Sequence, residues 1–413
     1  MVTKLDVFVE LYSRSGSQKI TDIVKSLKQP QSGYDRIRKI LEVLSSMKLI
    51  AKSRHGYAPV MNTKNQHLFD MLSYCIRNGV NYNDILDETV AVYLSRAFLK
   101  KSFAAKDIKL HPRTFSKISS ILEKNGFLVV VSRKPFRAFV PYNSLLGDVM
   151  AHYGHRLGVA IKQPDGYFKA IEKELARFRK LRVKSSRKYN EVMENFQIRF
   201  IHHSLSIEGN PITLAQTFQL LKEKVLPENV SIESVNEVQN YQKAFLQMLE
   251  DARSGAPLTK ETILNYHFIA MQHKKECAGI IRDDDVTIRG NKDFKVAPFE
   301  EIESLLEKLI NKYNAFLKGK KRHLKEILDF AAYFHNEFQH IHPFFDGNSR
   351  TTRLITFHLL QMNEIPIFDI PLGLLEEYVL ATKGARKRND KKLAQALQQI
   401  VLYNLKTINE KLL

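Results

Sequence analysis

Residues 340–353 read HIHPFFDGNSRTTR and stand between apolar sequences that have helical periodicity on both sides. Pro343 rules out a helix that continues through this stretch, so residues 342–349 are expected to form a loop that leads into a helix N-terminus. Such a terminus offers N–H groups without intrahelical partners and a partial positive charge, which suit phosphate. The stretch therefore predicts an anion-binding loop between two helices of a mainly helical domain.

The end of this loop and the helix behind it supply further groups for an anion. Gly347 permits the backbone to curl its amides around a phosphate, and Asn348 can donate from its side chain. Arg350 and Arg353 are three residues apart, so both project from one face of the first helical turn. Together these four residues predict a polyphosphate site.

Two more residues of the stretch indicate chemistry as well as binding. Asp346 would repel a bare phosphate, and its presence makes sense if a Mg²⁺ ion lies between the carboxylate and the phosphates. The imidazole of His342 can accept a proton from an attacking hydroxyl at neutral pH. A zinc site built from His335, His340 and His342 fits less well, because no cysteine or carboxylate completes a tetrahedral set at a known spacing. The stretch therefore indicates nucleotide phosphoryl transfer.

The string HPFFDGNSRTTR also resembles the signature of the Fic family, His-x-Phe-x-Asp/Glu-Gly-Asn-Gly-Arg-x-x-Arg. Every defined position agrees except Ser349, which keeps the backbone N–H but gives up the tolerance of positive φ that the family's usual glycine has. The resemblance implies a helical domain that binds ATP and most often transfers AMP to a protein hydroxyl. A carboxylate at position 346 favours AMP transfer over phosphate transfer. The implied roles are general base for His342, Mg²⁺ ligand for Asp346, and nucleotide binding for Gly347, Asn348, Ser349, Arg350 and Arg353.

Residues 204–210, SLSIEGN, resemble the family's inhibitory motif Ser/Thr-x-x-x-Glu-Gly/Asn, with Ser204, Glu208 and Gly209 in place. The resemblance implies that Glu208 pairs with Arg353 and so occupies the cation that would hold the ATP γ-phosphate. Removing Glu208 should then release activity. The alternative is that Glu208 is an ordinary helix carboxylate.

Residues 282–298, RDDDVTIRGNKDFKVAP, interrupt the helical pattern and predict a short hairpin around a Gly-Asn turn. The position matches the flap of the Fic family, in which Val286, Thr287 and Ile288 would align the target's backbone by strand addition. Residues 282–285 are expected to form a solvated turn, with ligation of a cation as the alternative. The whole resemblance covers about residues 195–375.

The basic residues are concentrated in the first half of the chain. The formal net charge is +20, and residues 1–200 contain 36 Lys and Arg against 17 Asp and Glu. Residues 1–62 and 84–143 each read as short helices, a longer helix and two extended runs around a basic turn, which resembles a winged helix-turn-helix used twice. Its exposed cations could contact DNA phosphates, or the modules could dock on protein or form a homodimer. The candidate cations are Arg36, Arg38, Lys39, Arg54, Arg113, Lys117, Arg133 and Lys134.

The sequence predicts a mainly α protein with winged-helix-like modules at 1–62 and 84–143, a connecting helix within 160–200 and a Fic domain at 201–413 with its core at about 201–375. The apolar periodicity of the connecting helix favours docking onto the next domain. No run approaches the roughly 18 apolar residues of a membrane span. Two cysteines and no secretory signal point to the cytoplasm.

These patterns lead to one functional expectation and several alternatives. The expected function is Mg²⁺-dependent transfer of AMP from ATP to a Ser, Thr or Tyr hydroxyl of a target protein, restrained by Glu208. One alternative is a nucleic-acid-binding regulator whose Fic domain is weakly active or modifies itself. Another is an enzyme of the same type that removes AMP or uses another nucleotide donor.

Overall fold

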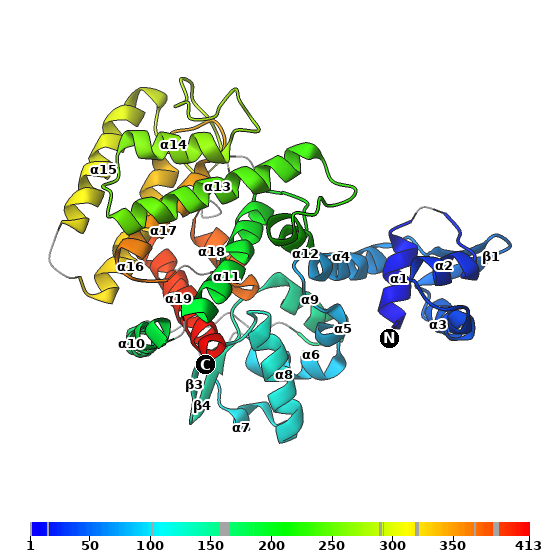
Figure 1. Ribbon diagram of the computed structural model, residues 1–413. Helices are drawn as coiled ribbons and strands as arrows, with labels where there is room; N and C mark the ends of the chain where they lie inside the picture. The colour runs from blue at the N-terminus through cyan, green and yellow to red at the C-terminus, as the bar shows by residue number, and fades with distance from the viewer. Residues whose placement is uncertain are drawn as a thin grey trace. The chain divides into compact units, whose positions relative to one another are not determined.

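The computed structural model describes residues 2–14, 16–98, 100, 102–156, 166–184, 186–288, 291, 293–318, 322–366, 369–382 and 388–413. Contacts between Cα atoms divide the chain into two compact units. Unit 1 contains residues 1–92 and 147–155, and unit 2 contains residues 93–146 and 156–413. Figure 1 shows that helices dominate the chain, as the apolar periodicity of the sequence predicts.

Unit 1 begins with the order of elements that the sequence predicts for residues 1–62. Three helices pack on one another through apolar side chains such as Phe8, Leu11, Leu41 and Leu44, all fully buried. An antiparallel hairpin follows, with Ile50 opposite Pro59 in its register. The elements are α1 (Lys4–Tyr12), α2 (Ile20–Ser26), η1 (Gln31–Gly33), α3 (Tyr34–Ser46), β1 (Ile50–Ser53), β2 (Gly56–Pro59), α4 (Thr63–Arg77) and α5 (Tyr82–Ile85).

The same order recurs in residues 88–139, but here it belongs to the larger unit. Two parts of this module contact the C-terminal helices. Near the end of α8, the carbonyl of Glu123 accepts from the Tyr403 hydroxyl at 2.8 Å, and after β4, Asn143 Nδ2 donates to the carbonyl of Leu372 at 3.1 Å. By its contacts, most of the second module is therefore part of unit 2, although the sequence predicts a separate module. The elements are α6 (Glu88–Ala97), α7 (Ala105–Ile108), α8 (Pro112–Lys124), β3 (Val129–Arg133), β4 (Phe136–Phe139) and α9 (Ser144–His152).

The rest of unit 2 is a helical bundle around α17, which packs against α13, α14 and α16 (Figure 1). Residues 350–360 of α17 are all buried, so this helix forms the centre of the bundle. The elements are α10 (Phe168–Lys184), α11 (Ser186–Ile207), α12 (Leu214–Phe218), η2 (Gln219–Glu223), α13 (Ile232–Ser254), α14 (Lys260–Ala270), η3 (Phe299–Glu301), α15 (Ile302–Leu317), α16 (Leu324–Ile341), α17 (Asn348–Met362), α18 (Leu372–Ala381) and α19 (Asp390–Leu412).

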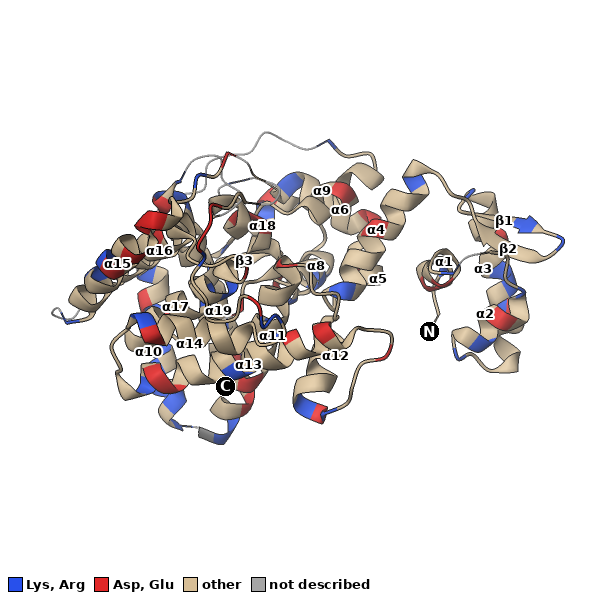
Figure 2. Ribbon diagram, turned by 90° about the horizontal axis from the view of Figure 1, so that it is seen from above, with Lys and Arg blue, Asp and Glu red and all other residues tan. Residues whose placement is uncertain are grey.

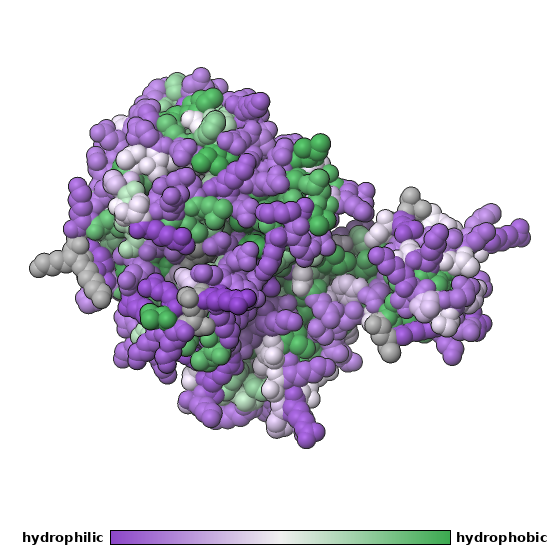
Figure 3. All heavy atoms as spheres, in the orientation of Figure 1, coloured by the Kyte–Doolittle hydropathy of each residue, from purple (hydrophilic) through white to green (hydrophobic). Residues whose placement is uncertain are grey.

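The connecting helix is α10, and the structure confirms the docking expected from its periodicity. Its apolar residues Ile171, Leu175 and Phe178 are buried, and the helix packs along α19. Most of its charged residues lie on the remaining surface, but Glu174 is buried and accepts a hydrogen bond from Asn409 of α19. On the face of the molecule seen in Figure 3, hydrophilic residues cover most of the surface, and hydrophobic residues form separate patches.

The segment predicted as a flap has no β-ladder among its described residues. Val286, Thr287 and Ile288 have no regular secondary structure, and β1–β4 are the strands of the described part of the chain. Residues 289, 290 and 292, the turn of the predicted hairpin, lie outside the described residues. The target-positioning role of residues 286–288 stays a prediction.

None of the helices within the described ranges is long and apolar enough to cross a membrane.

Candidate active site

The loop between α16 and α17 places His342 at its first position. His342 has a left-handed backbone, with φ 49° and ψ 60°, and its N–H donates to the carbonyl of Phe338 at 2.9 Å. Its ring atom Nδ1 lies 3.2 Å from the carbonyl of Gln339. Because a carbonyl can only accept, Nδ1 carries the proton of the neutral ring. The lone pair is then on Nε2, which makes that nitrogen the one able to take a proton.

Asn348 closes the loop on itself. Its Oδ1 accepts from the N–H of Phe344 at 3.0 Å, and its Nδ2 donates to the carbonyl of Phe344 at 2.6 Å. Both ends of the amide thus bind backbone, and donation from this side chain to an anion stays a prediction. The amide binds backbone because the curled loop leaves a buried N–H and C=O that need partners. The side chain of Asn348 therefore holds the shape of the loop between α16 and α17 by binding the backbone of Phe344.

Gly347 is the position of the loop where glycine is required. Its φ is +80°, and a Cβ there would lie 2.8 Å from His267 Nε2 and 2.9 Å from Met271 Cγ and Sδ. Ser349, by contrast, lies in the first turn of α17 with helical backbone. The replacement of the family's usual glycine at 349 thus causes no backbone strain in this structure.

His267, on α14, binds the backbone of the loop between α16 and α17. The N–H of Gly279 donates to Nδ1 of His267 at 2.9 Å, so Nε2 carries the proton and donates to the carbonyl of Asp346 at 2.8 Å. The ring also stacks on Phe344, with 3.6 Å between the ring centroids. Burial lowers the pKa of His267 to about 4, so the ring is neutral at pH 7. No sequence motif marks this histidine.

Asp346 lies among cations. Its Oδ2 accepts from Lys274 Nζ at 2.7 Å, and its Oδ1 accepts from Arg350 Nη2 at 2.8 Å and from the N–H of Gly347 at 2.6 Å. Burial raises the pKa of this carboxyl, but Arg350 and Lys274 outweigh that effect and hold the pKa well below its usual range. Asp346 is therefore ionised at neutral pH.

Arg350 forms ion pairs with protein carboxylates in this structure. Its side chain is 5% exposed and pairs with Glu237, on α13, as well as with Asp346. Glu237 in turn accepts from Asn210 Nδ2 at 2.8 Å. A buried guanidinium needs such partners, because an unpaired charge in the interior is strongly unfavourable. Binding of polyphosphate by Arg350 stays a prediction, and the sequence pattern did not identify Glu237.

The ion pair expected between Glu208 and Arg353 is present. Arg353 Nη2 is 3.1 Å from Glu208 Oε1, and the two side chains are 3% and 17% exposed. Arg353 also donates from Nε to Ser204 Oγ at 2.5 Å and from Nη2 to the carbonyl of Ser204 at 2.8 Å. Gly209, with φ +98°, follows Glu208 just after the end of α11. Ser204 and Glu208 of the predicted inhibitory motif thus meet at one arginine.

Arg282 is fully buried, which corrects the expectation of a solvated turn at residues 282–285. Its Nε donates to the carbonyl of His342 at 2.7 Å, its Nη1 to the carbonyl of Asp284 at 2.7 Å, and its Nη2 to the carbonyl of Ala297. The aspartates that follow are exposed, as expected. The side chain of Arg282 thereby joins the backbone of His342, the candidate base, to residues 282–298, the segment predicted to be a flap.

The residues at Asp346 fit a Mg²⁺ ion that completes its shell with phosphates and water. The carboxylate is 42% exposed, and the donor at its Oδ2 is the ammonium of Lys274, which is itself 36% exposed. Mg²⁺ is commonly bound by one or two carboxylates together with phosphate oxygens. A site made of protein ligands alone is not seen: the described ranges contain no group of three or more His, Cys, Asp and Glu able to bind a metal.

The histidines considered for zinc have other partners. His335 Nε2 is 2.6 Å from the hydroxyl of Tyr378, and burial lowers the pKa of His335 to about 3. His340 stacks on Phe294, with 4.9 Å between the ring centroids. His335 and His340 thus each contact an aromatic side chain of the protein.

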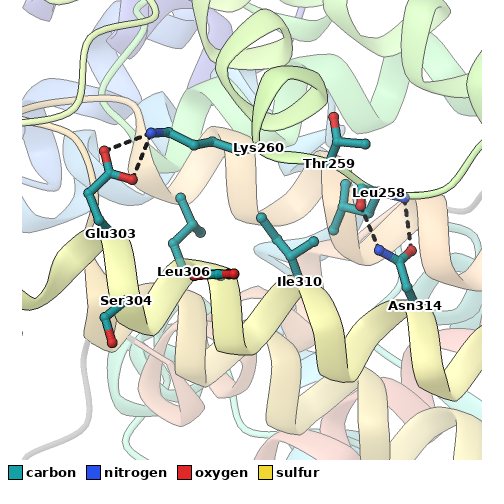
Figure 4. A pocket seen from close by; sticks show the side chains of 9 residues that line it. Leu258, Thr259, Lys260, Glu303, Ser304, Leu306, Ile310 and Asn314 are labelled. Carbon is teal, nitrogen blue, oxygen red and sulfur yellow. Dashed lines mark hydrogen bonds and ion pairs between the residues drawn. The ribbon is translucent and has the colours of Figure 1, made fainter.

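A cavity of about 520 Å³ lies between the start of α14 and α15 (Figure 4). Lys260 and Glu303 pair across its rim, and Asn314 binds the backbone of Leu258 through both ends of its amide. Its lining includes none of the site residues described above.

The nucleic-acid candidates are all exposed, but they differ in their partners. In unit 1, Figure 2 shows cations along α3 and at the β1–β2 turn, and Arg54 is in that turn. In unit 2, Arg133 pairs with Glu123 at 3.0 Å and with Glu410 at 2.6 Å. Exposed candidates on α3 are Arg36, Arg38 and Lys39, and those on α8 and in the β3–β4 turn are Arg113, Lys117 and Lys134.

Comparison with known proteins supports the resemblance seen in the sequence. Residues 257–360 match the model of the Fic/DOC family. The chain is 30% identical over 179 residues to Protein adenylyltransferase Fic of Drosophila persimilis, covering 43% of this chain and 34% of that protein. It is 24% identical over 269 residues to the protein of the same name in Drosophila willistoni, covering 65% of this chain and 52% of that one. The chain thus spans about a third to a half of the length of these curated relatives.

A solved structure shows the same fold. It is the crystal structure of a Fic domain containing signaling protein from Bacteroides thetaiotaomicron, which superposes with a TM-score of 0.52 at 20% identity. The match covers 59% of this chain and 97% of that protein. An identity of 20% shows a shared fold and does not show a shared activity.

Proposed function

We propose that this chain is a Mg²⁺-dependent protein adenylyltransferase, which transfers AMP from ATP to a Ser, Thr or Tyr hydroxyl of a target protein and is restrained by Glu208. The observation that carries the proposal is the loop from His342 to Gly347, in which an oriented imidazole, an ionised carboxylate and a helix N-terminus are adjacent. The adenylyltransferase relatives give the reaction type.

In this reaction the hydroxyl proton of the target passes to Nε2 of His342 while the hydroxyl oxygen attacks the α-phosphorus of ATP. The bond from the α-phosphorus to the oxygen bridging to the β-phosphate breaks, and pyrophosphate leaves. The N–H groups at the start of α17 face the phosphates and stabilise their charge. Asp346 would hold Mg²⁺, which when bound neutralises charge on the polyphosphate.

The restraint follows from the partners of Arg353. This guanidinium is almost fully buried, and Glu208 and Ser204 occupy its donors. A γ-phosphate that needs Arg353 must compete with Glu208 for it. Two anions at one buried cation repel each other, so ATP binds productively only when Glu208 has moved.

The test is labelling with ATP that carries ³²P at the α- or the γ-position, in the presence of Mg²⁺. Three proteins are compared with the wild type: Glu208→Gly, the double variant Glu208→Gly with His342→Ala, and Glu228→Gly. Glu228 is exposed in the loop before α13, whereas Arg353 is buried, so Glu228→Gly is a matched change at the surface. Protein labelled by α-³²P but not by γ-³²P identifies AMP transfer.

We expect labelling to rise at least about tenfold in Glu208→Gly. The buried ion pair with which ATP competes is worth at least about 1.4 kcal/mol, and that free energy changes an equilibrium constant tenfold. It should disappear in the double variant and stay at the wild-type level in Glu228→Gly. Equal labelling in all four proteins contradicts the proposed catalysis. Label from the γ-position would assign phosphate transfer instead.

A second function, DNA binding, is favoured by the cations of unit 1. Arg36, Arg38, Lys39 and Arg54 are exposed on the third helix and the wing turn, the positions that contact DNA in winged-helix proteins. A salt titration of binding to duplex DNA tests it. We expect replacement of Lys39 by Ala to reduce the salt dependence, as loss of one phosphate contact does. Replacement of Arg133, which pairs with two carboxylates, should have less effect. Binding without salt dependence would oppose this function.

The cytoplasm is the compartment we propose for this activity. Cys75 and Cys277 are both free and buried, so the structure uses no disulfide between them. Free, buried thiols suit a reducing compartment, which also supplies ATP.

A further inference from the structure

Lys274 is a cation at the candidate site that no motif of the sequence marks. It lies in the turns after α14, and its Nζ is 2.7 Å from Oδ2 of Asp346. The other carboxylate oxygen accepts from Arg350 and from the N–H of Gly347. The carboxylate proposed to hold Mg²⁺ is therefore already paired with a cation of the protein.

The two cations at Asp346 differ in how easily they can leave. Arg350 is 5% exposed and is tied to Glu237, so its guanidinium is fixed within the bundle. Lys274 is 36% exposed, and Asp346 is the carboxylate with which it forms its ion pair. A lysine ammonium is a compact point charge on a flexible stem, which can swing into water at little cost. Only Lys274 can vacate the carboxylate without disturbing the core.

We propose that Lys274 is a displaceable counter-cation, whose ammonium occupies the divalent-cation position at Oδ2 of Asp346 and must leave before the metal binds. The ammonium and the metal would both bind Oδ2 of Asp346, and two cations at one oxygen repel each other. Lys274 thus lowers the affinity of the site for a divalent cation while no nucleotide is bound. This inference rests on the proposed function only in taking Asp346 as the metal ligand.

The test measures metal binding directly, without nucleotide and without turnover. Mn²⁺ is titrated into the full chain, and the free ion is measured by electron paramagnetic resonance. The proteins are the wild type, Lys274→Met, Lys274→Gln, Lys275→Met, and Lys274→Met combined with Asp346→Asn. Lys275 is the exposed neighbour, so its replacement removes the same formal charge without touching Asp346.

We expect both Lys274 variants to bind Mn²⁺ about five times more tightly than the wild type, since an exposed ion pair is worth a factor of about two to five and the repulsion between cations is also removed. Lys275→Met should change the affinity by less than about twofold, because water and salt screen a charge without contact. The added Asp346→Asn change should abolish the gain, which places the metal at that carboxylate.

Three results overturn the inference: equal affinity of the wild type and the Lys274 variants, an equal gain in Lys275→Met, or no measurable Mn²⁺ binding by the Lys274 variants. The gain in affinity can be observed whether or not the protein transfers AMP. Conversely, labelling by α-³²P-ATP with no difference in Mn²⁺ affinity would retain the proposed function and remove only the role of Lys274.

Discussion

Replacement of Gly347 by alanine tests the geometry of the anion-binding loop most directly. Two costs arise at this position. A left-handed backbone costs a residue with a Cβ about 1–2 kcal/mol, and Gly347 has φ +80°. The new Cβ would also lie 2.8 Å from His267 Nε2 and 2.9 Å from two atoms of Met271. The His267 ring cannot move away from this Cβ without breaking a hydrogen bond, because both ring nitrogens are hydrogen-bonded.

Overpacking of this kind costs about 1–3 kcal/mol, so the total for Gly347→Ala is about 2–5 kcal/mol. Gly255, at the end of α13, is a matched control. It has φ +71°, but nothing lies within 4 Å of a Cβ built there, so Gly255→Ala bears only the backbone cost. The effect of alanine on the unfolded chain is common to both variants and cancels in the comparison.

Thermal denaturation followed by circular dichroism measures the difference. For a compact unit of roughly 300 residues, an extra 1–3 kcal/mol corresponds to a melting temperature lower by about 2–5 °C in Gly347→Ala than in Gly255→Ala. In the labelling assay, Gly347→Ala should lose AMP transfer while Gly255→Ala keeps it. Equal melting temperatures of the two variants would refute the steric argument.

Three other perturbations address the supports of the site. Arg282→Lys leaves buried carbonyls without donors, so we expect a lower melting temperature and at least tenfold slower labelling, with the exposed Asp283→Asn as the unaffected control. Asn348→Asp has the same shape but cannot donate to the carbonyl of Phe344, and urea denaturation should show a loss of about 1–3 kcal/mol. His358 is buried with its pKa lowered to about 4, so below pH 6.5 the unfolded chain binds a proton that the folded chain excludes, and stability falls as the pH falls. His358→Gln should reduce this slope by up to about 1.4 kcal/mol per pH unit between pH 6 and 5, whereas an unchanged slope would contradict it.

The sequence by itself determined the local features of this protein. Pro343 and Gly347 require a loop between α16 and α17, because proline stops a helix and glycine permits the positive φ that begins the next one. The resemblance of two motifs to those of the Fic family implied an ion pair between Glu208 and Arg353, which the structure contains. Apolar periodicity gave the helices of both halves, since that pattern follows from the helix repeat alone.

Only the tertiary structure decided which distant residues support the loop. His267, Lys274 and Arg282 lie about 60 to 80 positions before the residues that they bind, and nothing in their local sequence differs from an ordinary surface pattern. Their roles come from burial, which obliges each polar group to find a partner wherever the packed helices bring one. The same reason explains why Asn348 binds backbone and Arg350 binds carboxylates: a motif fixes residue types, whereas the packing around it fixes what each side chain contacts.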